Sequence, residues 1–351
     1  MISTKKIWVI IFIFTIIQGA RADTFSTTQT YFNKWAQKNE IIGAALAVND
    51  KTYFYGYSNK ELVAPVNIQT KFGIGSITKT FVSVILLKLE AEGKLDIHDH
   101  ITKYLPQYSK LKGVTIQALM QMTAGFNDGA DDSVSPVQQV DLAYAKYDPK
   151  SAGVWLYSNA SYQLLGILVE KITHRSLADA VSLFITSPLY LNSIEFPGSK
   201  QAASLKEYQN GQIKSSNFKN IYAAGGLVSS AYDLEKFIRH LFVIRDLLPP
   251  KQYAELTTFV KTPTKYYEFT GTKAPQFGLG VFKWNIPPYG DVLSYPGVLG
   301  EGFTSSYTVI GDNVIISQSN TYNNNDFTIL WVHQTFTKWL IKNLLSQEKL
   351  A

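Results

Sequence analysis

The stretch Phe72-Gly73-Ile74-Gly75-Ser76-Ile77-Thr78-Lys79-Thr80-Phe81, followed by a mostly apolar run over 82–90, decides the fold and chemistry expected of this chain. Gly73 and Gly75 predict a tight entry into a helix, because the backbone there turns without a Cβ in the way. Apolar residues then recur at helical spacing, and Gly93 predicts the end of the helix. Ser76 is therefore expected in the first turn, with Lys79 three residues later on the same face.

This arrangement makes Ser76 a candidate covalent nucleophile and Lys79 the group that helps to activate it. Unpaired amides at a helix start favour a developing alkoxide, and a buried lysine can take part in proton transfer. Ser-x-x-Lys spacing alone does not decide, because it occurs five times, starting at Ser3, Ser76, Ser109, Ser216 and Ser346. Only Ser76 combines a glycine-kinked entry with a long apolar helix. The alternative is a helix-start serine beside a solvated lysine.

Composition describes a globular protein with a sizeable core, because 46% of the 351 residues are hydrophobic and 17% are charged. The formal net charge is +6, and the basic residues form no cluster along the sequence, so nucleic acid is not an expected partner. The chain has no cysteine. A thiol nucleophile, disulfides and thiolate metal sites are therefore excluded.

Residues 1–22 are expected to be an export signal. Lys5 and Lys6 precede an 11-residue apolar run, Ile7 to Ile17, and Ala20-Arg21-Ala22 fits a small-x-small cleavage site. The run is shorter than the ~20 residues that span a bilayer. A retained membrane anchor is the alternative. We expect a periplasmic or secreted protein with the signal removed after Ala22.

His98 and His100 flank Asp99 and invite interpretation as a metal site. Such a pair needs further histidine or acidic ligands nearby. The remaining histidines, at 174, 240 and 333, belong to separate helical patterns. A polar loop after a helix is therefore expected, with neither a metal nor another cofactor.

Strand patterns lie near both ends of the chain, and helical patterns lie between them. Strands are predicted over 41–48, 52–57, 277–284, 306–310 and 314–319, and helices over 27–39, 115–122, 160–173, 177–184, 232–242 and 327–345. Adjacent strand runs joined by turns favour antiparallel pairing. The sequence therefore predicts an α/β (α+β) domain from 23–75 and 191–351, with an antiparallel sheet and terminal helices, and an inserted helical domain over 76–190.

A serine nucleophile also needs a base and an oxyanion site. The chain has no Gly-x-Ser-x-Gly elbow, and its five histidines lack a triad context. Tyr157, in a turn just before the apolar helix over 160–173, is the alternative base, and Asn159 is placed to bridge Lys79 and a substrate amide. A tyrosine that merely packs before a helix is the competing interpretation.

Five short motifs stand in order along the chain: residues 72–81, Lys103-Tyr104-Leu105-Pro106, Met122-Thr123-Ala124-Gly125, Leu156-Tyr157-Ser158-Asn159 and Gly278-Leu279-Gly280. With them the mature chain resembles the serine β-lactamase-related family of class C β-lactamases, D-alanyl-D-alanine carboxypeptidases and esterases. The resemblance implies a β-lactamase/transpeptidase-like fold with the site between sheet and helical domain. It also implies Ser76 as nucleophile, Lys79 and Tyr157 as the proton-transfer pair, and Asn159 as a positioning group.

The third family element departs from its pattern. Tyr295-Pro296-Gly297-Val298 stands where the family carries Lys-Thr-Gly, so Tyr295 replaces a cation and Pro296 removes an amide donor. Val298 is the expected second oxyanion amide beside that of Ser76, and Tyr295 and Gly297 are expected to contact substrate. A cationic partner for a substrate carboxylate contributes about 1.5–3 kcal/mol. Its replacement therefore favours esterase or D-peptidase-like activity over efficient β-lactam hydrolysis.

The expected function is that of an exported serine hydrolase working through an acyl-enzyme on a β-lactam, D-amino-acid peptide or carboxylic ester. The alternative is a catalytically weak penicillin- or peptidoglycan-binding module, which the altered third element motivates. The expected partner is a small-molecule or peptidoglycan-derived substrate, and the chain is expected to be a monomer.

Overall fold

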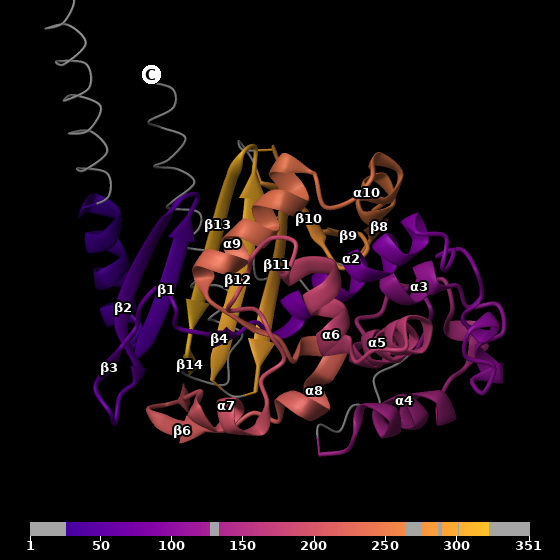
Figure 1. Ribbon diagram of the computed structural model, residues 1–351, viewed down its shortest axis with the longest axis horizontal. Helices are drawn as coiled ribbons and strands as arrows, with labels where there is room; N and C mark the ends of the chain where they lie inside the picture. The colour runs from indigo at the N-terminus through magenta and orange to yellow at the C-terminus, as the bar shows by residue number, and fades with distance from the viewer. Residues whose placement is uncertain (1–25, 127–132, 264–274, 287–289, 301, 323–351) are drawn as a thin grey trace, which may run out of the picture.

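The computed structural model describes residues 26–126, 133–263, 275–286, 290–300 and 302–322. Its central layer is a nine-stranded sheet of order β3-β2-β1-β13-β12-β11-β10-β9-β8, in which every neighbouring pair is antiparallel (Figure 1). The strands are β1 (Gly43–Val48), β2 (Lys51–Asn59), β3 (Ala64–Pro65), β8 (Val260–Lys261), β9 (Gln276–Phe277), β10 (Phe282–Ile286), β11 (Gly290–Leu299), β12 (Phe303–Ile310) and β13 (Asn313–Ser319). Strands from both ends of the described chain thus meet in one layer.

Two small sheets lie beside this layer. β4 (Phe72–Gly73) pairs with β7 (Val228–Ser229), and a second sheet has the order β14-β5-β6, formed by Thr321–Tyr322, Glu207–Gln209 and Gln212–Lys214. β4 leads directly into the Ser76 segment, so its pairing with β7 helps to place that segment.

The helices gather mainly beyond the β10 side of the sheet, while α9 crosses one sheet face (Figure 1). They are α2 (Thr78–Ala91), α3 (Ile116–Met120), α4 (Pro136–Ala145), α5 (Asn159–Thr173), α6 (Leu177–Val181), α7 (Ser199–Ser204), α8 (Phe218–Gly225), α9 (Ala231–Arg239) and α10 (Pro250–Leu256), with a further helix over 26–38. Among the described residues, no helix is long and apolar enough to cross a membrane.

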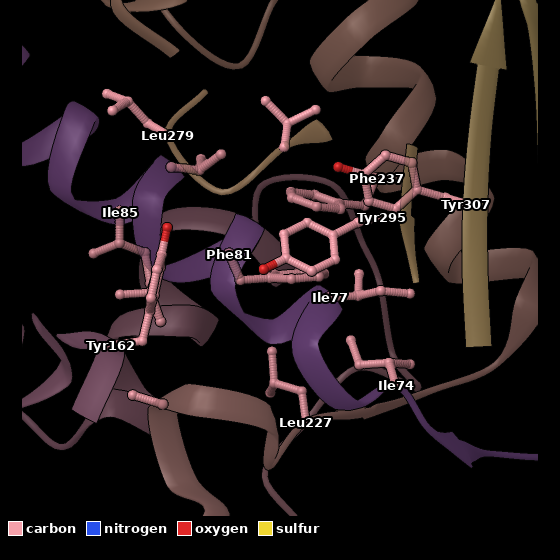
Figure 2. Close-up of a cluster of buried hydrophobic side chains, with 14 of the residues drawn as sticks. Ile74, Ile77, Phe81, Ile85, Tyr162, Leu227, Phe237, Leu279, Tyr295 and Tyr307 are labelled. Carbon is pink, nitrogen blue, oxygen red and sulfur yellow. The ribbon is translucent and has the colours of Figure 1, made fainter. Parts of the chain in front are cut away.

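Helix α2 forms the centre of the core. All its residues except Lys88 and Ala91 are buried, as expected for a helix enclosed on every side rather than lying on a surface. Phe81 of α2 stacks on Phe237 of α9 with ring centroids 3.9 Å apart, among the buried side chains of Figure 2. This packing fixes α2 against α9, and with it the groups carried by the first turn of α2.

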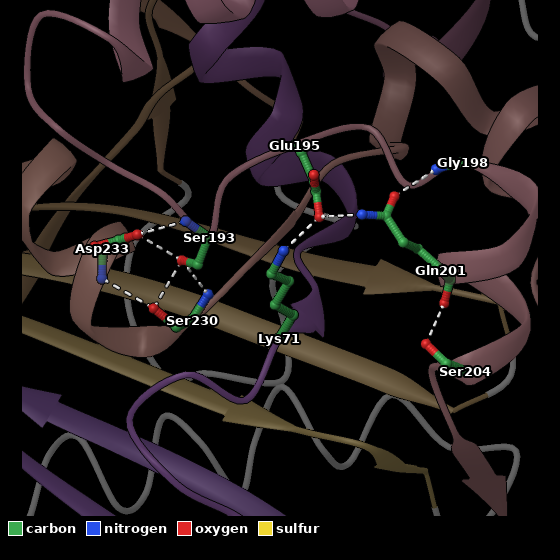
Figure 3. A network of polar contacts seen from close by, with 8 residues as sticks. All are labelled: Lys71, Ser193, Glu195, Gly198, Gln201, Ser204, Ser230 and Asp233. Atoms are coloured by element: carbon green, nitrogen blue, oxygen red, sulfur yellow. Dashed lines mark hydrogen bonds and ion pairs between the residues drawn. The ribbon is translucent and has the colours of Figure 1, made fainter.

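Buried polar contacts tie the segment after α6 to the start of α9 (Figure 3). The Asp233 carboxylate accepts hydrogen bonds from the Ser193 amide and hydroxyl, each at 2.7 Å, and the Ser230 hydroxyl caps α9. Nearby, Lys71, the residue before β4, pairs with Glu195. These contacts brace β4, which leads into the Ser76 segment, and β7, which pairs with β4.

The predicted fold class is confirmed, and the strands predicted over 41–48 and 52–57 are present as the antiparallel pair β1 and β2. The predicted 115–122 helix ends at Met120, because Met122 adopts a positive φ of 60° that an α-helix does not accommodate. The predicted export signal and the helix over 327–345 lie outside the described residues. The domain boundaries stay a prediction.

Candidate active site

Ser76 lies in a 3-10 turn, Gly75–Ile77, immediately before α2. Gly75 has φ +50°, and a Cβ on it would lie 2.5 Å from the carbonyl oxygen of Val298. Only glycine therefore fits both the left-handed backbone conformation and the close approach of β11. The result is a half-buried Ser76 whose backbone lies against the end of β11.

Lys79 is fully buried, and its Nζ contacts three oxygen atoms. It lies 2.9 Å from Ser76 Oγ, 2.8 Å from Asn159 Oδ1 and 2.5 Å from the carbonyl oxygen of Ala224. An ammonium has three donors, so all three are used. As a neutral amine, Lys79 would donate to the Asn159 and Ala224 oxygens and direct its lone pair at Ser76 Oγ. In either protonation state the amine thus stays directed at the serine.

Tyr157 reaches the same serine from the other side. Its hydroxyl lies 2.6 Å from Ser76 Oγ, and Lys79 Nζ lies 5.1 Å from its ring centroid. The ring contacts Trp155 edge-on at 6.4 Å, and Ser158 caps α5 immediately afterwards. The structure therefore brings together the four residues predicted to act in concert, Ser76, Lys79, Tyr157 and Asn159.

A second tyrosine lies close to the amine but does not reach the serine. Lys79 Nζ is 5.7 Å from the ring centroid of Tyr162. The Tyr162 hydroxyl donates to the carbonyl oxygen of Met120 at 2.7 Å, and burial raises its pKa. Tyr162 therefore packs beneath the amine as a neutral phenol.

The end of β11 supplies a backbone wall opposite Tyr157. β10 pairs with β11 only up to Ser294, so beyond that residue the same edge of β11 faces the Ser76 turn. A Cβ on Gly75 would lie 2.6 Å from the Val298 amide nitrogen, and one on Gly297 would lie 3.1 Å from the Ser76 amide nitrogen. The Val298 amide thus lies close to the Gly75–Ser76 backbone, where it and the Ser76 amide are candidates for an oxyanion site.

Pro296 does not interrupt the pairing of β11 with β12. Amide groups alternate between the two edges of a strand, so the nitrogen of Pro296 faces the same edge as that of Val298, away from β12. A proline is tolerated where its nitrogen does not face a neighbouring strand. The N–H that proline lacks at position 296 is therefore not needed for pairing with β12. The amide near the Ser76 turn is that of Val298, which Pro296 leaves in place.

The predicted contact between Tyr295 and substrate is corrected by the structure. The Tyr295 side chain is 1% exposed, and its ring lies edge-on to Phe282 at 5.1 Å and to Phe277 at 6.0 Å. Figure 2 places it among the core side chains. Alternation along β11 directs Tyr295 inward, whereas the side chain of Val298 is 39% exposed. Gly297 contributes only backbone, packed against the Ile74 carbonyl.

Sequence reasoning missed the carbonyl oxygen of Ala224, the third partner of Lys79. The stretch Ala223-Ala224-Gly225-Gly226 carries no side chain that predicts a role at the site. A backbone carbonyl leaves no mark on residue identity. The one available signal was the glycine pair, which permits a close backbone approach: a Cβ on Gly225 would lie 3.3 Å from the Gly75 backbone.

The two histidines considered as metal ligands do not belong to a ligand cluster among the described residues. His98 Nε2 is 3.8 Å from Glu255 Oε1, and His100 forms an isolated β-bridge with Thr115. Across the described ranges, no group of three or more His, Asp or Glu side chains is arranged to hold a metal ion.

Comparison with known families gives a match to the Beta-lactamase family over residues 28–333. This chain belongs to that family. Its serine turn, buried lysine and tyrosine are thus carried by a β-lactamase-family hydrolase, and the resemblance stated from the five motifs is confirmed.

Curated relatives of low sequence identity align with most of this chain. PbpX of Bacillus subtilis (strain 168), named as a candidate penicillin-binding protein, is 23% identical over 290 residues, covering 77% of this chain and 67% of PbpX. The chain spans about half the length of further curated relatives that it matches, 48% in each case.

Solved structures of similar proteins cover more of the chain. A D-stereospecific amidohydrolase from Streptomyces sp. has a TM-score of 0.71 at 26% identity, covering 84% of this chain and 94% of that one. The D-amino acid amidase from Ochrobactrum anthropi SV3, solved with L-phenylalanine, has a TM-score of 0.79 at 20% identity, covering 92% and 99%. At 20% identity, the similarity to the D-amino acid amidase shows a shared fold and no more.

Proposed function

We propose that this β-lactamase-family hydrolase acts through an acyl-enzyme at Ser76, on amides, short peptides or esters of D-amino acids in preference to β-lactams. The observation that carries the proposal is the position of Ser76 Oγ, 2.9 Å from Lys79 Nζ and 2.6 Å from the Tyr157 hydroxyl. A nucleophile within hydrogen-bond reach of two proton-transfer groups is the arrangement that covalent catalysis requires.

The proposed reaction begins when Ser76 Oγ attacks the carbonyl carbon and passes its proton to the Lys79–Tyr157 pair. The carbonyl oxygen becomes an oxyanion, which the amides of Ser76 and Val298 stabilise. The bond to the leaving nitrogen or oxygen then breaks, and Tyr157 returns the proton to that atom. A water molecule cleaves the acyl-enzyme by the reverse use of the same pair, so the Ser76 hydroxyl is restored with no net change in protons.

The substrate preference rests on β11. No lysine or arginine occurs between Gly290 and Leu299, so that strand offers no cation to the carboxylate of a β-lactam or peptidoglycan stem. Amides and esters without a free carboxylate do not need one. The similarity to a D-stereospecific amidohydrolase, at 26% identity, supports an amide substrate of D configuration.

The deciding experiment exposes wild type and Ser76→Ala to three probes: the p-nitroanilide of D-phenylalanine with its L enantiomer, a p-nitrophenyl acyl ester, and a fluorescent penicillin. Intact mass reports a covalent adduct, and absorbance reports turnover. We expect turnover of the D-anilide and the ester by wild type alone, with slow penicillin labelling. Equal rates for Ser76→Ala, or rapid turnover of penicillin alone, would refute the proposal.

The second candidate function is a binding module for penicillin or peptidoglycan. The replacement of Lys-Thr-Gly by Tyr-Pro-Gly favours it. In the same experiment it predicts a lasting penicillin adduct at Ser76 without turnover of the anilide or ester. The two candidates therefore give opposite results with one set of probes.

We further propose that the chain is exported, with cleavage after Ala22, and that the mature protein is a monomer. The basic start, short apolar run and small-x-small site of residues 1–22 support export. N-terminal sequencing of protein recovered from the periplasm and medium tests the cleavage site. Light scattering coupled to gel filtration tests the monomer.

A further inference from the structure

One face of α5 serves the candidate site at more than one point. Asn159, Gln163 and Gly166 are spaced by four and three residues, so they lie along one stripe of the helix. Asn159 Oδ1 accepts a hydrogen bond from Lys79. The next two members of the stripe contact α8, the helix that presents the Ala224 carbonyl to the same amine.

Helix α8 is broken at Tyr222. This residue has φ 43° and ψ −128°, outside the helical region and strained for a residue with a Cβ. After the break, the Gly226 amide donates to the Tyr222 carbonyl at 2.7 Å, and the Ala224 carbonyl turns toward Lys79. A strained backbone persists only where its surroundings hold it, so the neighbours of the break determine where the Ala224 oxygen lies.

Two buried glutamines hold the residues just before the break. Gln163 Nε2 donates to the carbonyl oxygens of Asn220 at 3.0 Å and of Ile221 at 3.2 Å. Gln139 Nε2, from α4, donates to the same Asn220 oxygen at 2.8 Å, and both glutamine side chains are 1% exposed. These donors bind carbonyls that a continuous helix would use internally, and they stabilise the broken form.

Gly166 makes room for the other side of the break. A Cβ there would lie 2.5 Å from the Cβ of Ala223 and 2.7 Å from the Tyr222 ring. Contacts that short force a displacement. Gln163 thus holds the residues before the break while Gly166 admits those at and after it, so α5 contacts α8 on both sides of the strained residue.

We infer that Gln163 is a positioning residue for the reaction: it holds the break in α8 so that the Ala224 carbonyl accepts from Lys79 and keeps the amine directed at Ser76. The inference rests on the proposed function at Ser76. Because Gln163 acts through α8 and Lys79 and does not touch substrate, its loss slows acylation without weakening the binding that precedes it.

The test compares Gln163→Met with a matched control, Gln252→Met. Gln252 is also buried, at 5% exposure, but its amide donates to Glu90 at the opposite end of α2. Inactivation by a fluorophosphonate ester gives kinact and KI separately. For Gln163→Met we expect kinact to fall about 10- to 100-fold with KI unchanged, since a misplacement of ~1 Å is sufficient for such a loss. Gln252→Met is expected to leave both constants within about twofold of wild type.

Hydrogen exchange at residues 223–226 supplies a readout independent of activity. Faster exchange of the Gly226 amide in Gln163→Met, but not in the control, is expected. If wild type itself does not react with the probe, the proposed function has failed, and exchange still reports on the positioning of α8. Unchanged exchange, or equal losses of kinact in the two variants, overturns the inference.

Gly166→Ala tests the same break without removing any hydrogen-bonding group, and it decides the matter where Gln163→Met does not fold. The added methyl displaces Ala223 and Tyr222, so kinact is expected to fall with KI unchanged. A wild-type kinact in folded Gly166→Ala contradicts the inference.

Discussion

Both ends of α2 carry buried ionisable side chains, but the groups that surround them differ. At the start of the helix, the Lys79 amine has only neutral oxygen partners: a hydroxyl, a side-chain amide and a backbone carbonyl. At the end, Glu90 faces Glu255 of α10, with Gln252 donating to Glu90 at 3.1 Å and Lys251 lying 3.5 to 3.6 Å from both carboxyls. Within the described residues, the amine at one end thus has no acidic partner beside the half-buried Ser76, whereas the other end gathers two acids and a lysine.

The two carboxyls have their pKa values shifted in opposite directions. Burial and the adjacent Glu90 carboxylate raise the pKa of Glu255 to about 7. For Glu90, burial acts in the opposite direction to its hydrogen bonds from Glu255, Gln252 and the Ile97 amide, and the bonds prevail and lower its pKa. His98 and Lys251 are the other titratable groups facing the pair. Under the proposed function the groups at the start of α2 serve chemistry, whereas the carboxyl pair at its end affects the pH dependence of stability.

Replacing Lys79 is expected to have the largest effect. Lys79→Met keeps the length of the side chain but removes the amine, so acylation by the ester should slow by about 10²- to 10⁴-fold, the usual contribution of acid–base catalysis. Stopped-flow kinetics of the reaction with the ester measures the acylation rate constant of wild type and Lys79→Met. Glu90→Gln, the matched change at the other end, should leave acylation within about twofold. Equal losses in the two variants would end the distinction between the two ends of the helix.

Removing the Tyr157 hydroxyl comes next. Tyr157→Phe retains the ring contact with Trp155 and loses the 2.6 Å contact with Ser76, so kcat should fall about 10²-fold with little change in melting temperature. Tyr108→Phe is the control. The Tyr108 hydroxyl lies 3.4 Å from the Asp141 carboxylate and does not contact Ser76. A Tyr157→Phe enzyme with wild-type kcat would assign the proton transfer to Lys79 alone.

Tyr295→Lys tests which face of β11 is directed into the core and which is exposed. Because Tyr295 is enclosed by Phe277 and Phe282, a lysine there buries an unpaired ammonium, which costs several kcal/mol. We expect a lower urea midpoint and no faster labelling by fluorescent penicillin. Val298→Lys, on the exposed side of the strand, is the comparison. Faster penicillin labelling by Tyr295→Lys would show that its side chain reaches the substrate.

The carboxyl pair predicts the smallest effect, a change in the pH dependence of stability. Because the folded pKa of Glu255 is raised from 4.5 to about 7, its contribution to the free energy of unfolding is full below pH 4.5 and is lost as pH rises to about 7. Glu255→Gln should remove that slope between pH 5 and about 7, measured by urea unfolding. Glu92→Gln, an exposed neighbour, should keep it. If the free energy of unfolding varies with pH in the same way for wild type and Glu255→Gln, the pKa of Glu255 is not raised in the folded state.

The sequence alone determined what depends on local spacing. Ser76 and Lys79 lie one turn apart, Tyr157 and Asn159 flank the start of a helix, and the apolar periods around them identify α2 and α5. These patterns, in order along the chain, were sufficient to predict the fold class and the family. They arise from the 3.6-residue and two-residue periods of helix and strand, which residue identity records directly.

Only the tertiary structure decided which groups meet across the chain. The Ala224 carbonyl beside Lys79, the two glutamines on the break in α8 and the Glu90–Glu255 carboxyl pair at the end of α2 all join segments far apart in sequence. The direction of Tyr295 also depended on the register of β11, because a shift of one residue moves every side chain of a strand to the opposite face. Backbone carbonyls and strand register carry no residue code of their own, so long-range packing alone places them.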